Sequence, residues 1–354
     1  MHSPHYPTLE VSLEAVARNY TLLKRKGAGR CAAVVKANAY GLGAEEVAPA
    51  LYHAGCRDFF VATLDEGIAL RQVFRKHSFA QADIYVFHGV RAGQASEFAA
   101  YGLIPVLNDR GQIEHWRDSG RYALHIDTGM CRLGVTPREL DALPPVTGNL
   151  QLVMSHLANA GDPQSPQNAE QLEAFRQALH HFPGIPASLA NSSGVFLGKE
   201  YHFDLLRPGC SLYGISPNTS LPNPVENVVR LSAPVLQYRF IGQDQLVGYG
   251  GEGRAGKGAV LATLELGYAD GFLRALGNRA YGFAEGIKVP IIGRVSMDMV
   301  SVDLTAVPEH LRTPDLRITF IGHEQPVDIV AETAGTIGYE IFTRLGTRVR
   351  RVYA

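Results

Sequence analysis

The sequence has no long hydrophobic run, almost no net charge and few cysteines. No stretch approaches the roughly 18 uninterrupted apolar residues of a membrane-spanning helix. The 33 Lys and Arg residues nearly balance the 34 Asp and Glu residues, which leaves a net charge of −1. Such a chain has no basic field to hold nucleic acid or an anionic membrane surface, so neither partner is expected.

The cysteines argue against two kinds of stabilised fold. They stand far apart and form no Cys-x-x-Cys pair, which favours reduced thiols over a disulfide framework or a zinc site. No metal is therefore predicted. The beginning of the chain also lacks the apolar core of a signal peptide. Together these absences predict a cytoplasmic enzyme or binding protein. The cysteines are Cys31, Cys56, Cys131 and Cys210.

The composition that is present is ordinary for a globular protein, with 46% hydrophobic and 19% charged residues. The length predicts about two domains. Residues 8–11 form a short strand pattern, and the next segment has apolar residues on one helical face after Ser12, a suitable N-cap.

Eight short apolar runs then follow, most of them separated by helical patterns. Runs of this kind are typical of buried parallel strands, and eight of them predict a (β/α)8 barrel of the TIM type. A doubly wound sheet is the alternative, although no Gly-x-Gly-x-x-Gly follows the first run. The runs are residues 31–36, 59–63, 83–88, 104–108, 122–127, 150–156, 185–191 and 203–209.

The pattern changes after about residue 215. Residues 216–227 are rich in turn formers, and the segments that follow are β-like runs punctuated by glycine. This predicts a barrel domain over residues 1–222 and a mostly-β domain over residues 223–354.

In a barrel of this type the chemistry lies at the carboxyl ends of the strands. A lone polar residue there is usually a solvated or satisfied group, but eight closing strands direct all of these residues to one mouth. They are Lys36, His88, Asn108, Asp127 with Arg132 beyond it, His156, Asn191 with Ser192, and Arg207.

Two features of these strand ends indicate a cofactor. Lys36 ends a strongly apolar strand, and apolar surroundings lower an amine's pKa and so favour covalent or base chemistry. Asn191 and Ser192 follow the seventh strand and Arg207 the eighth, which is where barrels commonly bind phosphate. A reactive lysine and a phosphate cradle in one mouth predict pyridoxal phosphate (PLP).

At these residues the sequence resembles the alanine racemases, a family of barrel-type, PLP-dependent amino-acid racemases. The resemblance extends over nearly the whole chain, in several blocks that occur in the family's order. The blocks are VVKANAYGLG (34–43), IDTGMCRLGV (126–135), SHLANA (155–160), LANSSG (189–194), RPGCSLYG (207–214), LGYADG (266–271), GRVSMDM (293–299) and GTIGYE (335–340).

The resemblance implies an isomerase that supplies D-alanine for peptidoglycan, acting as a homodimer with shared active sites. Lys36 would bind PLP covalently and act as one base, and Tyr268 of the neighbouring subunit would be the other. Arg207 would face the pyridine nitrogen, and His156 would hydrogen-bond the tyrosine. Besides Lys36, Arg207 and His156, the implied cofactor contacts are Asn191 and, on the phosphate side, Tyr40, Ser192, Gly209, Cys210 and Tyr339. The implied substrate contacts are Arg132 and Met297.

The sequence departs from the family pattern at one position. Many members carry a carbamylated lysine two residues before the Asp of the IDTGM block, where it orients the arginine. This chain has His125 there, and an imidazole cannot form a carbamate. A bound anion, a water molecule or His125 itself would have to orient Arg132.

The residue types suit racemisation, because inverting a carbon needs a base on each face and each base must return the proton as an acid. An arginine at the ring nitrogen does not readily give up a proton. Three alternatives remain at this point. They are a racemase of serine or of broader specificity, a barrel-type PLP decarboxylase of basic amino acids, and a non-catalytic PLP carrier. The Arg-Pro-Gly and GYADG blocks argue against the decarboxylase, and the second domain argues against the carrier.

Overall fold

The computed structural model describes residues 6–27, 29–145, 148–218 and 221–354. The chain divides into two compact units, one of residues Glu14–Glu226 and one that combines Asn227–Ala354 with the chain's beginning up to Leu13. The predicted boundary after residue 222 stays a prediction, and residues 219–220 of the predicted linker lie outside the described residues.

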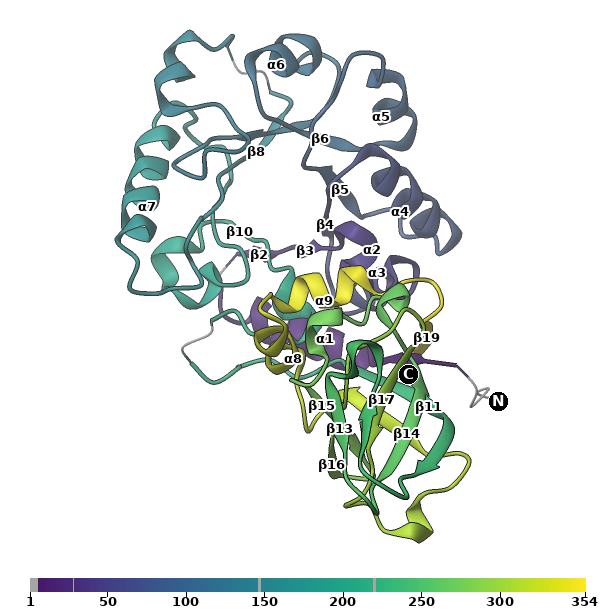
Figure 1. Ribbon diagram of the computed structural model, residues 1–354. Helices are drawn as coiled ribbons and strands as arrows, with labels where there is room; N and C mark the ends of the chain where they lie inside the picture. The colour runs from purple at the N-terminus through teal and green to yellow at the C-terminus, as the bar shows by residue number, and fades with distance from the viewer. Residues whose placement is uncertain (1–5, 28, 146–147, 219–220) are drawn as a thin grey trace. The chain divides into compact units, whose positions relative to one another are not determined.

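The first unit contains a closed barrel of parallel strands (Figure 1). Strands β3 to β9 are hydrogen-bonded in sequence order, and β10 and β2 close the ring. The N–H of Ala32 donates to the carbonyl of Leu206 at 2.8 Å, and the N–H of Arg207 donates to that of Ala190 at 2.9 Å. Ala32 alone separates β2 from β3, so the two act as one strand of eight. The barrel prediction is confirmed, and the doubly wound alternative is excluded because its sheet stays open.

The barrel strands coincide with the eight apolar runs. They are β2 (Arg30–Cys31), β3 (Ala33–Val34), β4 (Asp58–Val61), β5 (Asp83–Val86), β6 (Ile104–Leu107), β7 (Tyr122–His125), β8 (Leu150–Met154), β9 (Ala187–Ser188) and β10 (Leu205–Leu206).

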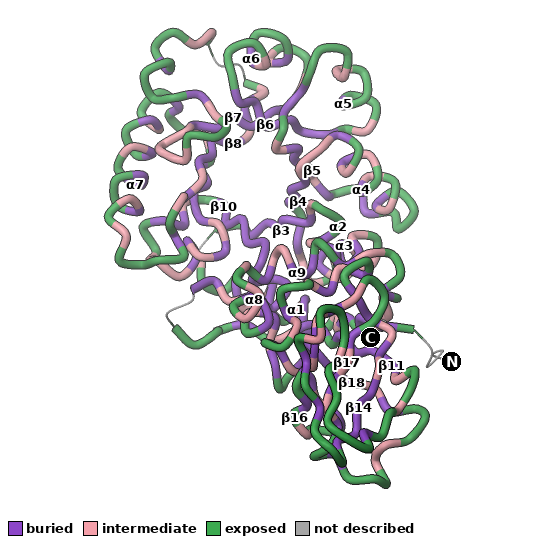
Figure 2. Tube along the Cα trace, viewed as in Figure 1, coloured by how far each residue is buried: buried purple, intermediate pink, exposed green. Residues whose placement is uncertain are grey.

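Helices surround this ring, with buried inner faces and exposed outer faces (Figure 2). Helix α4 shows why one of them begins where it does: the Thr63 side chain accepts the N–H of Glu66, and the Glu66 carboxylate accepts the N–H of Thr63, which makes a capping box. The helices are α1 (Leu13–Lys24), α3 (Ala44–His53), α4 (Leu64–Lys76), α5 (Ala95–Tyr101), α6 (Arg110–Trp116) and α7 (Pro166–Leu179). The short element α2 (Lys36–Tyr40) follows the end of β3 and is of a different kind.

An apolar cluster fills the inside of the barrel. Side chains alternate between the two faces of a strand, so every second residue of these strands points inward. The residue two positions after a cluster member therefore tends to point to the carboxyl-end mouth. The cluster consists of Ala32, Val34, Phe60, Tyr85, Ile104, Val106, Ala123, Leu152, Met154 and Leu205.

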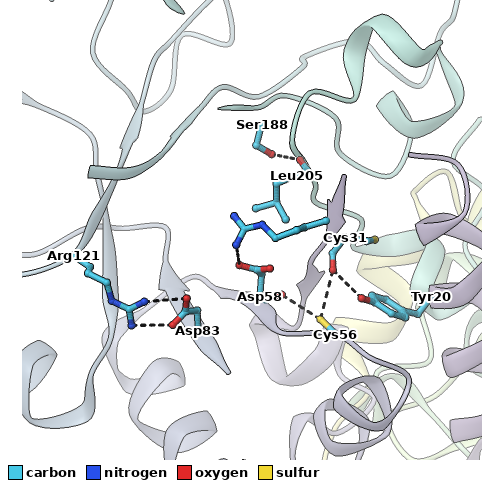
Figure 3. Close-up of polar contacts among 9 residues, drawn as sticks. Tyr20, Cys31, Cys56, Asp58, Asp83, Arg121, Ser188 and Leu205 are labelled. Carbon is cyan, nitrogen blue, oxygen red and sulfur yellow. Dashed lines mark hydrogen bonds and ion pairs between the residues drawn. The ribbon is translucent and has the colours of Figure 1, made fainter. Parts of the chain in front are cut away.

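Charge pairs link the strand beginnings at the amino-terminal end of the barrel (Figure 3). Arg30 pairs with the buried Asp58 at 3.1 Å. Arg121 holds both carboxylate oxygens of Asp83, at 2.9 and 3.0 Å. Beside them the Tyr20 hydroxyl donates to the carbonyl of Cys31 at 2.9 Å. These contacts bind strand beginnings to one another.

The second unit is mostly β, as predicted, with the addition of two short helices. Its eight-stranded sheet includes β1, which pairs antiparallel with β11 and parallel with β19. Within the described residues no helix of either unit is long and apolar enough to cross a membrane. The elements are β1 (Thr8–Val11), β11 (Val229–Phe240), β12 (Gln245–Val247), β13 (Gly253–Ala255), β14 (Val260–Glu265), β15 (Tyr281–Ala284), β16 (Ile287–Pro290), β17 (Met299–Asp303), β18 (Arg317–Ile321), β19 (Arg350–Tyr353), α8 (Val327–Ala334) and α9 (Gly338–Arg344).

Candidate active site

Lys36 begins α2, which is a turn of left-handed helix. Ala37, Asn38, Ala39 and Tyr40 all have φ between 50° and 56°. A left-handed turn of non-glycine residues costs roughly 1–2 kcal/mol per residue, so its surroundings must hold it in place. Strained backbone of this kind is often found at functional sites.

Glu66 of α4 holds the start of this turn. Its Oε1 accepts the N–H of Ala37 at 2.7 Å, and its Oε2 accepts the N–H of Ala62, also at 2.7 Å. The Asn38 side chain closes the other end by accepting the N–H of Ala44 at 2.8 Å. The backbone that carries Lys36 is thus fixed from both sides.

The Lys36 amine lies among apolar and cationic groups. Its Nζ is 5.7 Å from the centre of the Phe87 ring. Burial lowers the pKa of Lys36, and the positive charge of Arg132 lowers it further, against an opposing effect of Glu66. A larger fraction of the amine is therefore neutral than for an ordinary lysine, as a base or nucleophile requires.

Arg207 is a buried guanidinium two residues beyond the core residue Leu205. It donates to the Ser188 hydroxyl and, at 2.5 Å, to the carbonyl of Ser155. Burial lowers the pKa of Arg207 to about 9, so the group stays protonated at neutral pH. No carboxylate of the described residues forms an ion pair with it.

His156 is influenced by these positive groups but is itself neutral at neutral pH. Its pKa is well below the ordinary range because of burial and the charges of Arg207, Arg132 and Lys36. The buried Gln171 of α7 fixes the segment that carries it, accepting the N–H of Ala158 at 2.8 Å and donating to the carbonyl of His156 at 3.0 Å.

Arg132 lies on an exposed loop that Asp127 shapes. One carboxylate oxygen of Asp127 accepts the N–H groups of Gly129, Met130 and Cys131 at 2.8–3.1 Å. These bonds lower the pKa of Asp127 against the opposing effect of its burial, which is the larger single influence. The side chain of Arg132 makes no hydrogen bond or ion pair within the described residues.

Four of the predicted phosphate contacts come together after β9 and β10. The Ser192 Oγ accepts the N–H groups of Gly209 at 2.9 Å and Ser211 at 3.2 Å, which leaves its own proton to be donated. Tyr40 packs against this segment, and a Cβ on Gly209 would collide with the Tyr40 hydroxyl. Cys210 is buried beside them. Asn191 instead accepts the N–H of Gly194 at 2.9 Å and so shapes the turn.

These residues fit PLP. An amine of lowered pKa, a hydroxyl proton beside a glycine and a buried cation without a carboxylate match the aldehyde, phosphate and ring nitrogen of that cofactor. Of the remaining polar strand-end residues, Asn108 is buried and His88 is exposed on the surface, whereas Phe87 lies beside Lys36.

The second unit carries the other predicted site residues, Tyr268 and Met297, on two segments bound to each other. Tyr268 N–H donates to the carbonyl of Ser296 at 3.0 Å, and Ala269 N–H to that of Met297 at 2.9 Å. A Cβ on Gly267 would lie too close to the Met297 carbonyl, so glycine is required there. The side chains of Tyr268 and Met297 are 42% and 54% exposed and are available for contact with another molecule.

Arg348 ties these two segments together by charge. Its Nε lies 2.6 Å from the buried Asp270, and its Nη1 lies 2.8 Å from Asp298. The other oxygen of Asp270 accepts the N–H of Gly267 at 2.7 Å. Tyr339 stands apart in sequence, in α9 of the same unit.

Sequence reasoning missed the residues that orient the site. Glu66, Gln171, Ser188 and Arg348 do not stand out in the sequence, because polar residues on helices, short strands and turns are usually solvated. One signal was available for Ser188: it is a hydroxyl in an otherwise apolar strand, and such a buried group needs a partner.

The family models for the N-terminal and C-terminal domains of alanine racemase match residues 11–217 and 228–353. The alanine racemase of Rhodospirillum rubrum is 48% identical, and the alignment covers 98% of this chain and 95% of the relative. The catabolic alanine racemase of Agrobacterium fabrum is 46% identical, with 98% and 91% covered.

Solved structures show the same likeness. The alanine racemase of Bartonella henselae, which has covalently bound pyridoxal phosphate, aligns with a TM-score of 0.92 at 38% identity. That alignment covers 99% of this chain and 100% of the other. The biosynthetic alanine racemase of Pseudomonas aeruginosa aligns with a TM-score of 0.88 at 32% identity, with 99% of each chain covered.

Proposed function

The chain belongs to the alanine racemase family, and from this membership we propose that it interconverts L-alanine and D-alanine with PLP. The observation that carries the proposal is the carboxyl-end mouth of the barrel. There, an amine of lowered pKa is influenced by the guanidinium of Arg132, and burial together with the charges of Arg207, Arg132 and Lys36 keeps His156 neutral.

Lys36 would hold PLP covalently and exchange the α-proton on one face of the amino acid. When bound, PLP supplies the electron sink that makes that proton acidic. The lowered pKa of Lys36 supports its role as a base near neutral pH, and the hydrogen bonds of Glu66 to the adjacent backbone support a fixed direction of attack.

Arg207 would face the pyridine nitrogen. It remains protonated at neutral pH, so it would donate a hydrogen bond and would not readily transfer a proton. This limits how strongly the ring withdraws electrons and disfavours the competing transamination. Ser188 and the carbonyl of Ser155 hold the guanidinium in place.

Tyr268 would be the second base, supplied by the partner subunit of a homodimer together with Met297, whose N–H would meet the substrate carboxylate. The exposure of both side chains supports this arrangement. Arg132 would bind the same carboxylate. Tyr40, Ser192, Gly209, Cys210 and Tyr339 would contact the phosphate, with Asn191 shaping their turn. The enzyme would work in the cytoplasm, where it supplies D-alanine for peptidoglycan.

Activity on alanine is tested by optical rotation of L-alanine with the purified protein, with and without added PLP. Decay of rotation to zero without loss of amino acid is expected, and L-serine should react more slowly. Carbon dioxide release from lysine or arginine would instead support the decarboxylase. An inert protein that still binds PLP would support the carrier.

The second base is tested with Tyr268→Phe in deuterium oxide. Lys36 would still exchange the α-proton of one enantiomer, so exchange of L- and D-alanine should be impaired unequally. Exchange of both at the wild-type rate would exclude Tyr268 as a base.

The shared site is tested by mixing inactive Lys36→Ala and Tyr268→Ala proteins under conditions of subunit exchange. Each heterodimer should regain one complete site. Heterodimers that form but remain inactive would mean that each site lies within one chain.

A further inference from the structure

The His125 imidazole is buried at the end of β7, and a single residue fixes its protonation pattern. Its Nδ1 lies 2.9 Å from Oδ1 of Asn108. The amide nitrogen of Asn108 donates to the carbonyls of Phe87 at 2.9 Å and Val106 at 2.8 Å. Because both carbonyls only accept, the Asn108 oxygen must face His125, and the proton must lie on Nδ1.

This tautomer leaves the lone pair on Nε2. That atom is buried, and none of the residues in the described ranges hydrogen-bonds it. A buried acceptor without a donor is costly, so a nearby donor is expected to occupy it in the working enzyme. The charged and titratable groups that act on His125 are Arg207, Arg132, Asp127 and His156.

Of these groups, the guanidinium of Arg132 suits the vacant acceptor. Three acceptors hold Arg207 in place, namely the Ser188 hydroxyl and the carbonyls of Ser155 and Leu189, whereas the Arg132 side chain has no hydrogen-bond partner among the described residues. The loop that carries Arg132 leaves β7 at His125 and returns to the same place, because the N–H of Val135 donates to the His125 carbonyl at 2.9 Å.

We propose that His125 is a positioning residue whose Nε2 accepts a hydrogen bond from Arg132 and so orients that guanidinium toward the substrate carboxylate. Asn108 sets the tautomer that makes Nε2 an acceptor. The inference rests on the proposed role of Arg132 in substrate binding. The neutral imidazole of His125 would supply the orienting contact that the Arg132 side chain otherwise lacks among the described residues.

The tautomer is tested by ¹⁵N NMR of the histidine-labelled holoenzyme at pH 7. The His125 signals are identified as those missing from His125→Asn. A protonated Nδ1 and an unprotonated Nε2 are expected, and a protonated Nε2 would overturn the proposal. This readout does not depend on turnover, so it stays valid even if the protein does not racemise alanine.

The contact with Arg132 is tested by kinetics. His125→Asn keeps a donor for Asn108 but removes the acceptor at Nε2, and should raise KM for alanine about tenfold while kcat changes little, as for the loss of one hydrogen bond to a charged group. His125→Gln, which reaches the Nε2 position, should recover much of the loss. The exposed His115 of α6 provides the control variant His115→Asn, which should behave as wild type.

A double-mutant cycle separates positioning from packing. In an Arg132→Lys background, His125→Asn should raise KM far less than it does alone, because the oriented group is already gone. An equal increase in both backgrounds would show that His125 does not act through Arg132 and would overturn the proposal.

Discussion

The two ends of the barrel use charge in opposite ways. At the amino-terminal end, Asp58 and Asp83 are each paired with an arginine. At the carboxyl end, the carboxylates of Glu66 and Asp127 accept backbone N–H groups instead. Among the described residues, no ion pair includes Lys36, Arg132 or Arg207.

This difference separates stability from function on one scaffold. At the amino-terminal end, the carboxylates of Asp58 and Asp83 are paired with arginines of the same end, and these pairs hold the strands together. The carboxyl end gathers cations that have no anionic partner within the described part of the barrel. In the proposed function, the substrate carboxylate would be the partner of Arg132. Substitutions at the two ends should therefore affect different properties.

The largest effect is expected from Lys36→Met. Racemisation should fall by about 10⁴-fold or more, since a general base alone contributes about 10²–10⁴ and the covalent anchor is lost with it. The apoprotein should become more stable at neutral pH, because burial lowers the pKa of Lys36 and so disfavours its charged form in the folded state.

Initial rates and thermal unfolding of the apoprotein check both parts. Lys76→Met, at an exposed pair with Glu45, is the control and should change neither. Borohydride reduction of the holoenzyme followed by peptide mapping should place the pyridoxyl group on Lys36. Its recovery on another lysine would refute the assignment.

The second prediction concerns the stability of the folded protein in acid. Burial, and next the charge of Arg207, lower the pKa of His125 from 6.5 to about 4. Between these values only the unfolded chain takes up the proton, so the folded state loses stability as pH falls, by about 3 kcal/mol at most. Urea unfolding of wild type and His125→Asn from pH 7 to pH 4 should show a smaller loss in the variant. Parallel losses would contradict the lowered pKa.

At the amino-terminal end of the barrel, we expect a titrating group to change the folding stability with pH in the opposite direction. Burial raises the pKa of Asp58, and the charge of Arg30 opposes this. Arg30→Met should cost about 1–2 kcal/mol at pH 7, less than for a fully buried pair because Arg30 is half exposed. The cost should shrink as pH falls through the raised pKa of Asp58, while kcat/KM stays unchanged. A loss of activity in folded Arg30→Met protein would show that the two ends are coupled.

The smallest effect is expected from Arg121→Lys. The substitution keeps the charge opposite Asp83 but cannot make both hydrogen bonds of the guanidinium. Because the pair is partly exposed, the loss should be about 0.5 kcal/mol, measured by urea unfolding. A loss as large as that of Arg30→Met would mean that exposure does not govern these pairs.

The sequence allowed the barrel to be predicted because buried parallel strands are nearly continuous apolar runs. The carboxyl-end residues followed from topology, since every strand of such a barrel ends at the same mouth. The left-handed turn after Lys36 did not follow, because Ala-Asn-Ala-Tyr contains no glycine to indicate it. The place of Tyr268 came only from the family resemblance, and helices α8 and α9 were not distinguished from the β pattern around them.

The pairing of β1 with β19 has a consequence for biosynthesis. Thr8 lies opposite Arg350 in this pairing, so the second unit joins the two extremes of the described chain. The ribosome makes about 5–20 residues per second, so β1 waits for tens of seconds before its parallel partner exists. The whole barrel is synthesised in that interval and can fold first.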